Sequence, residues 1–181
     1  SNMSYGEVLG LNENTHFYLY DLEDKAPKKI TNGDYDAAMN NSVGTDARFG
    51  GGPSLRVKDG KVYFLTTEKD SAKLNTLALD GTVTRVVDEA GTVETFDVTG
   101  DVVYFTAMRD LDLPELYKLE AGEETKLTNF SKALENIELS PVESFRYTTN
   151  GSEVTGYVIT PVGHVPGQKA PGLLEVHGGP K

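Results

Sequence analysis

The sequence contains no cysteine, few basic residues and no long hydrophobic run, and each shortage excludes a class of protein. Without cysteine there is no disulfide bond, no catalytic thiolate and no cysteine-ligated metal. This also fits a reducing compartment, so we expect a cytoplasmic protein. Only 17 residues are lysine or arginine against 28 that are aspartate or glutamate, which gives a net charge of −11. Because phosphate contacts require basic side chains, we expect neither nucleic acid nor an anionic membrane as a partner.

Long apolar segments and helical patterns are also missing. No segment approaches the length of a membrane span, which needs about 18 apolar residues. The N-terminus lacks the basic and then apolar pattern of a signal peptide. The best helical segment, 132–139, is short. Glycine and proline are frequent, with 19 and 8 residues, so the sequence predicts many turns, and its composition is compatible with an all-β fold.

An internal repeat is the main pattern in the first part of the chain. The motif at 19–23, followed by Lys-Ile-Thr-Asn at 29–32, returns 97 residues later with the same spacing. The motif Asp-Gly-Lys-Val-Tyr-Phe at 59–64 returns in altered form 41 residues later. A period of about 40 residues, made of short strands and turns, is typical of a β-propeller blade.

One whole blade can be traced through 55–87, with tight turns at Asp59-Gly60 and Asp80-Gly81 between its strands. A second blade follows over 93–127, and 17–32 supplies only the outer two strands of an earlier one. We therefore predict a partial β-propeller of about two to three antiparallel blades, since a closed propeller needs at least about four. Open sheet edges recruit other chains, so we also expect a homo-oligomer.

The pattern changes near Ser140. We place a domain boundary there, between the propeller region, 1–140, and a second region, 141–181. Alternating residues flank Asn150-Gly151, which is the strongest short signal for a hairpin turn, and so a β-hairpin is predicted after the boundary. The polar segment 32–53 fits neither region; it is predicted to be a surface loop or, alternatively, a loop that lines substrate access.

The last residues carry the most specific motif. An apolar run at 173–176 predicts a buried strand, and it leads into His177, Gly178, Gly179 and Pro180. Together with the blades and the hairpin, this motif resembles the prolyl oligopeptidase family of serine peptidases, in its acylaminoacyl-peptidase and dipeptidyl-aminopeptidase branch. The resemblance implies a propeller that filters substrates by size, followed by an α/β-hydrolase domain, of which this chain would carry the first strands.

The resemblance also assigns a role to the motif. His177-Gly178-Gly179-Pro180 would be the oxyanion loop, in which the backbone N–H of Gly179, with Gly178 as the second candidate, stabilises the developing negative charge. Glycine suits this position because a side chain would block the close approach of the substrate. His177 is not the expected triad base, since that base follows the nucleophile in the chain. A plain strand-ending turn is the alternative interpretation of the two glycines.

No Gly-x-Ser-x-Gly motif follows the loop. The chain is therefore predicted to be a catalytically incomplete part of a serine peptidase that hydrolyses short peptides, or their N-acylated forms. The alternatives are a non-catalytic propeller-like module that self-assembles, and part of an esterase-type α/β-hydrolase. The three histidines, His16, His164 and His177, show no metal-ligand spacing, so no metal or cofactor is expected. His16 and His164 are expected to be exposed.

Overall fold

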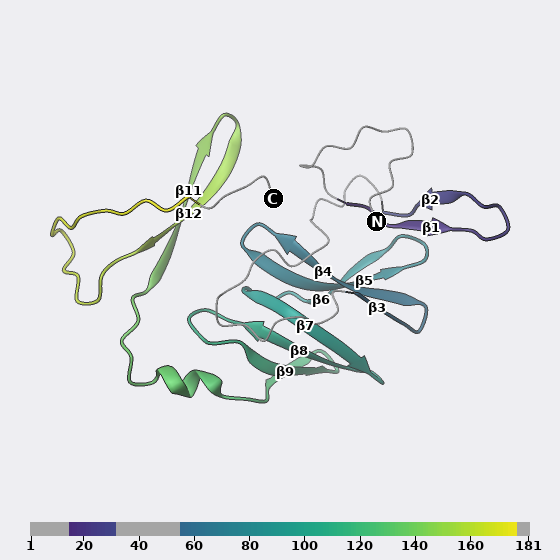
Figure 1. The fold of residues 1–181 in the computed structure, drawn as a ribbon, viewed down its shortest axis with the longest axis horizontal. Helices are drawn as coiled ribbons and strands as arrows, with labels where there is room; N and C mark the ends of the chain where they lie inside the picture. The colour runs from purple at the N-terminus through teal and green to yellow at the C-terminus, as the bar shows by residue number, and fades with distance from the viewer. Residues whose placement is uncertain (1–14, 32–54, 177–181) are drawn as a thin grey trace. The chain divides into compact units, whose positions relative to one another are not determined.

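The computed structural model describes residues 15–31 and 55–176, and the structural statements below concern these residues (Figure 1). They divide into two compact units: the first contains 15–31 and 55–131, and the second contains 132–176. The domain boundary at Ser140 stays a prediction. In the described ranges no helix is both long and apolar enough to cross a membrane.

Eight strands of the first unit form two antiparallel meanders of four strands, which we call blade I and blade II (Figure 1). Blade I consists of β3 (Leu55–Lys58), β4 (Lys61–Glu68), β5 (Ser71–Ala78) and β6 (Val83–Val87). Blade II consists of β7 (Thr92–Thr99), β8 (Val102–Met108), β9 (Glu115–Glu120) and β10 (Glu123–Lys126). Within each blade, every strand pairs with the next one in the sequence. The described fold is therefore all-β with propeller blades, as the repeat predicts.

Two observations confirm that the blades are repeated units. Tyr63 and Tyr104, which lie 41 residues apart, each occupy the third position of the second strand of a blade. The two meanders are joined by a single parallel bridge, between Ala72 and Thr92. The strand ladders of the two blades are thus linked at this bridge alone among the described strands, while the blades also share a core and a linker.

A shorter antiparallel pair, β1 (Tyr18–Tyr20) and β2 (Pro27–Lys29), forms the predicted half-blade. The Phe17 ring packs edge-to-face on Phe64 of blade I, with ring centroids 4.8 Å apart. Gly81, in the turn between β5 and β6, has a φ of +93°, and a Cβ there would lie 2.1 Å from the Ile30 carbonyl oxygen. Only glycine permits this approach, so the half-blade sits against blade I.

A threonine hydroxyl accepts a backbone N–H at the same place in the half-blade and in blade II, and we call this contact a threonine lock. The Phe17 N–H donates to Thr31 Oγ1 at 3.1 Å, and the Leu116 N–H donates to Thr128 Oγ1 at 2.9 Å. The threonines are 97 residues apart, as in the sequence repeat, but their partners are 99 apart. The β1–β2 hairpin therefore contains two more residues than its counterpart. Tyr18, and not Tyr20, is the structural equivalent of Tyr117; the shift by two keeps each side chain on its face of the sheet.

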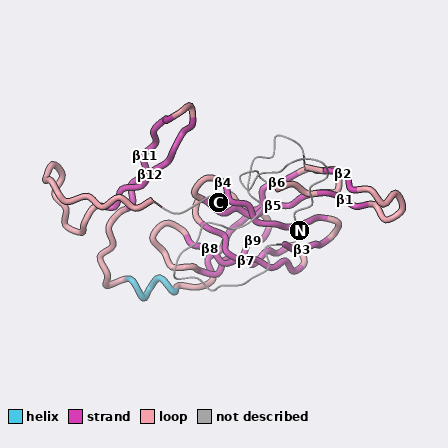
Figure 2. Tube along the Cα trace, turned by 45° about the horizontal axis from the view of Figure 1, so that its top comes forward, coloured by secondary structure: helices cyan, strands magenta, loops and turns pink. Residues whose placement is uncertain are grey.

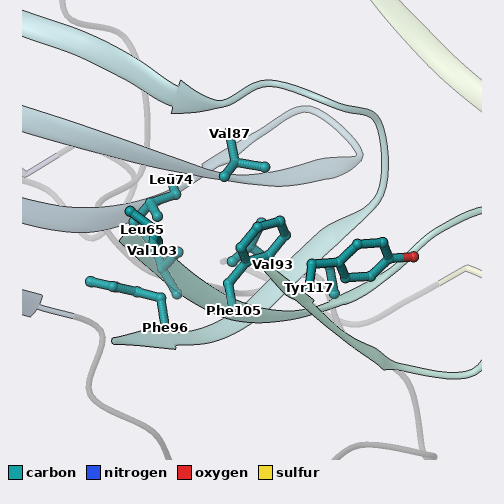
Figure 3. Close-up of a cluster of buried hydrophobic side chains, with 9 residues drawn as sticks. Leu65, Leu74, Val87, Val93, Phe96, Val103, Phe105 and Tyr117 are labelled. Atoms are coloured by element: carbon teal, nitrogen blue, oxygen red, sulfur yellow. The ribbon is translucent and has the colours of Figure 1, made fainter. Parts of the chain in front are cut away.

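The hydrophobic core lies between the two blades (Figure 3). Its buried members are Leu65, Leu74, Val87, Val93, Phe96, Val103, Phe105, Ala107 and Tyr117. Along β8 they take alternate positions: residues 103, 105 and 107 are buried and those between them are not. In β4 and β5, by contrast, the consecutive residues 64–66 and 74–77 are buried.

The linker between the blades is held by cations from both of them. Lys73 of blade I and Arg109 of blade II donate to consecutive backbone carbonyls of 88–90, with Arg109 at 2.9 and 3.0 Å. The Arg109 guanidinium also lies 5.9 Å from the centre of the Phe105 ring and 5.5 Å from that of Tyr117. These contacts fix the two blades to each other through their linker.

The second unit contains a β-hairpin without a hydrophobic core of its own. The 3-10 helix η1 (Phe130–Leu134), drawn in cyan in Figure 2, leads into it and replaces the helical segment predicted over 132–139. Strands β11 (Val142–Thr149) and β12 (Ser152–Ile159) pair along their whole length. Asn150 and Gly151 have φ values of +50° and +79°, as a type I′ turn requires, which confirms the predicted hairpin.

Candidate functional site

The predicted oxyanion loop falls beyond the part of the chain that the structure describes. His177, Gly178, Gly179 and Pro180 all lie outside the described residues, as does the segment 32–53, which was predicted to be a surface loop or, alternatively, to line substrate access. Their assignment stays a prediction, and the described residues show only how the chain approaches the motif.

The approach to the motif differs from the prediction. Residues 171–176 have no regular secondary structure, and the side chains of Leu173, Leu174 and Val176 are 96%, 86% and 79% exposed. The buried strand predicted at 173–176 is therefore wrong for the described chain. An apolar run becomes a strand only beside another strand that accepts its hydrogen bonds, and no described strand pairs with this one.

One described histidine lies beside a hydroxyl, in the arrangement of a nucleophile and its base. His16 Nδ1 lies 3.0 Å from Thr31 Oγ1, which is within the range expected for such a pair. Thr31, however, is only 1% exposed, and its hydroxyl already accepts the N–H of Phe17. A substrate cannot reach it, so the pair is structural. The expectation that His16 and His164 are exposed is also wrong, because both are half-buried.

The most strongly organised polar group in the described residues is the carboxylate of Glu115, at the start of β9. Its side chain is 0% exposed. One oxygen accepts hydrogen bonds from the Thr128 hydroxyl at 2.5 Å and from the Phe130 N–H at 2.9 Å. The other accepts the N–H and the hydroxyl of Ser131, both at 2.8 Å. Lys126 Nζ lies 3.6 Å from this second oxygen. Four donors thus converge on one carboxylate.

The electrostatics of this cluster follow from its hydrogen bonds. Burial raises the pKa of the Glu115 carboxyl, but the hydrogen bonds from Thr128, Ser131 and Phe130 outweigh burial and lower the pKa from 4.5 to about 2. Lys126 is in turn paired with Asp112, which raises the pKa of the lysine. Glu115 therefore remains charged at neutral pH, and it fastens the chain where it leaves blade II.

The sequence repeat points to some of the residues in the Glu115 cluster. Glu115 precedes the second copy of the repeat, and Thr128 belongs to its Lys-Leu-Thr-Asn motif. His16 takes the same place in the half-blade, one residue before the backbone N–H that donates to the threonine. The repeat could thus have pointed to a polar partner for each threonine, but not to the donors from Phe130 and Ser131. In the described ranges no group of histidine, aspartate and glutamate is arranged to hold a metal ion.

Comparisons with known proteins place the fold. No protein-family model matches the sequence, and no curated protein resembles it closely enough to count as a relative. Among solved structures, acylaminoacyl peptidase from Pyrococcus horikoshii matches 83% of this chain at 24% identity and a TM-score of 0.61. An acylaminoacyl peptidase in complex with Z-Gly-Gly-Phe-chloromethyl ketone matches 88% of it, also at 24% identity, with a TM-score of 0.66.

The extent of these matches locates the chain within the larger fold. It spans only 21% and 23% of the length of the two structures. Residues 1–140 are 140 of the 181 residues, or 77%, so a match over 88% of the chain includes part of the segment after Ser140. The chain therefore has the fold of part of acylaminoacyl peptidase, and the resemblance inferred from the sequence is confirmed at the level of the fold.

Proposed function

We propose that this chain is part of a serine peptidase of the prolyl oligopeptidase family. Residues 1–140 would be a portion of its propeller domain and 141–181 the first strands of its α/β-hydrolase domain. The observation that carries the proposal is the match to acylaminoacyl peptidase over 83–88% of the chain, in a sequence that also contains His-Gly-Gly-Pro at 177–180.

The proposed reaction is the hydrolysis of short peptides, or of their N-acylated forms, through an acyl-enzyme. One matched acylaminoacyl peptidase was solved with a peptide chloromethyl ketone, Z-Gly-Gly-Phe-chloromethyl ketone, which supports a peptide as the substrate class. In acyl transfer the substrate carbonyl oxygen becomes negatively charged. The N–H of Gly179, or of Gly178, would donate to it, and His177 and Pro180 would hold the loop in place.

We further propose that the chain associates with other copies through its open sheet edges, and that it acts in the cytoplasm. Strands β3, β6 and β10 each pair with one described strand only. Of these, β10 has the sequence Glu-Glu-Thr-Lys and is exposed throughout, and such charged edges resist pairing. The edges of β3 and β6 are therefore the better candidates. The absence of cysteine supports the proposed location.

The first test concerns the chain by itself. Purified residues 1–181 should not turn over a chromogenic acyl-amino-acid or dipeptide substrate, because neither a nucleophile motif nor its base is present to form the acyl-enzyme. Turnover that persists through repurification would contradict the proposal. If the longest reading frame that contains this sequence also yields no peptidase, the non-catalytic, self-assembling module becomes the better interpretation.

The second test concerns the oxyanion loop in the protein produced from that longest reading frame. Replacing Gly179 by proline removes the backbone N–H, and losing one such donor costs roughly 10²–10³ in kcat. His177→Ala should act more mildly, since it changes only the support of the loop. A folded Gly179→Pro enzyme with near-normal kcat would show that the oxyanion role belongs to another residue.

A further inference from the structure

The tip of the β11–β12 hairpin brings together an unengaged amide side chain and an unengaged backbone N–H. Asn150 and Gly151 are both exposed. Neither the side chain of Asn150 nor the N–H of Gly151 makes a hydrogen bond to any described residue. A Cβ built on Gly151 would meet nothing within 4 Å, so the space around the tip is open to solvent.

We propose that Asn150 is a site of spontaneous deamidation. The Gly151 nitrogen loses its proton to water and attacks Cγ of Asn150, which forms a new C–N bond and a cyclic imide. The Cγ–Nδ2 bond breaks, and the amide group takes up a proton and leaves as ammonia. Water then adds to either imide carbonyl, so the ring opens to aspartate or to isoaspartate. Glycine permits the attack because it has no side chain to obstruct it.

The type I′ turn must open before the nitrogen can reach Cγ, and here the opening is easy. A two-stranded hairpin with no further strand is marginally stable, and every residue of β11 is exposed. Local opening therefore needs little free energy at this tip. On the face of β11 that carries Phe145 and Tyr147, the two rings stack on each other and Phe145 covers Gly156.

The other asparagines in the described residues lack one of these conditions. Asn75 is 2% exposed and donates to Thr66. Asn129 precedes Phe130, whose N–H is held by Glu115. Asn136 is exposed, but it precedes a β-branched isoleucine, which obstructs the attack. Asn136 is therefore a matched control within the same molecule.

The modification would change the hairpin itself. Isoaspartate inserts an additional methylene into the backbone, whereas the pairing of Thr149 with Ser152 requires a connection of two ordinary residues. We therefore expect the modified hairpin to lose register near its tip, and the chain to gain one negative charge.

The experiment is to incubate the purified chain in mildly alkaline buffer and to follow the peptides by mass spectrometry and isoaspartyl methyltransferase labelling. We expect progressive loss of the Asn150 peptide, with both aspartate and isoaspartate products, while the Asn136 peptide stays intact. The N150Q variant should lose the signal from this peptide. The Asn32-Gly33 pair, outside the described residues, is mapped as a separate peptide.

Three results would overturn the proposal. The first is an Asn150 peptide that survives as long as the Asn136 peptide. The second is conversion to aspartate alone, which would indicate direct hydrolysis without an imide. The third is conversion that occurs only after unfolding in urea, since the proposal requires that local opening of the hairpin, without unfolding of the chain, already gives access.

Discussion

Replacing Glu115 by glutamine tests how the chain is fastened at the end of blade II. The carboxylate accepts four hydrogen bonds, two on each oxygen. Glutamine keeps the shape but turns one oxygen into an NH₂ group, which would face two donors instead of accepting from them. We therefore expect a lower free energy of unfolding at neutral pH, because buried donors lose their partner.

The size of the effect follows from the pKa. A fall in the pKa of Glu115 from 4.5 to about 2 corresponds to about 3 kcal/mol, at 1.36 kcal/mol per pH unit. The cluster lies near solvent, since Phe130 is 49% exposed and Thr128 and Ser131 are only half-buried. Screening lowers the contribution, so we expect a loss of about 1–3 kcal/mol.

The loss should depend on pH in a defined direction. The folded pKa lies below the unfolded one, so the stabilising contribution is fully present above pH 4.5 and disappears as the pH falls from 4.5 toward about 2. The difference between wild type and Glu115→Gln should therefore be largest at neutral pH and shrink below pH 4.5.

Urea unfolding followed by circular dichroism at several pH values measures this difference. Glu120→Gln is the control on the same strand, since its exposed pair with Lys118 should contribute less than about 1 kcal/mol. A difference for Glu115→Gln that is equal at pH 7 and pH 3, or no larger than that of the control, would refute the reasoning.

Two further substitutions test how the blades are held together. Gly81→Ala should destabilise the protein by more than Gly60→Ala. Both positions have a positive φ, where a side chain costs about 1–2 kcal/mol, but only at Gly81 would the Cβ also lie against Ile30. Equal unfolding midpoints in urea would mean that the half-blade does not pack against Gly81. Arg109→Met should cost about 2 kcal/mol through its lost hydrogen bonds and ring contacts, and a thermal midpoint unchanged from wild type would show that the linker is held by other groups.

Local patterns account for what the sequence predicted well. The strands of both blades follow from short β-forming runs between turn residues, and the hairpin turns follow from Asp59-Gly60 and Asn150-Gly151, which adopt the positive φ that such turns need. These signals depend only on neighbouring residues. The four-stranded blades could therefore be predicted without knowledge of the contacts between them.

Features that depend on distant partners were missed. The apolar run at 173–176 predicts a strand, but a strand also needs a neighbour, which the run does not specify. The repeat matched Tyr20 to Tyr117, because the sequence does not reveal that one hairpin is two residues longer. The pKa of Glu115 depends on donors that lie 13 to 16 residues away in the chain.

The two threonine locks differ in the side chain that contacts the threonine hydroxyl. At Thr31 the hydroxyl has the half-buried His16 as its polar partner, whereas at Thr128 the partner is the carboxylate of Glu115. Only the carboxylate has a second acceptor atom, and this second oxygen accepts the N–H and the hydroxyl of Ser131, where the chain leaves the blades. A histidine at position 115 could not accept from four donors at once, since each imidazole has at most one acceptor nitrogen. The choice of glutamate therefore follows from what comes after blade II, and not from the blade itself.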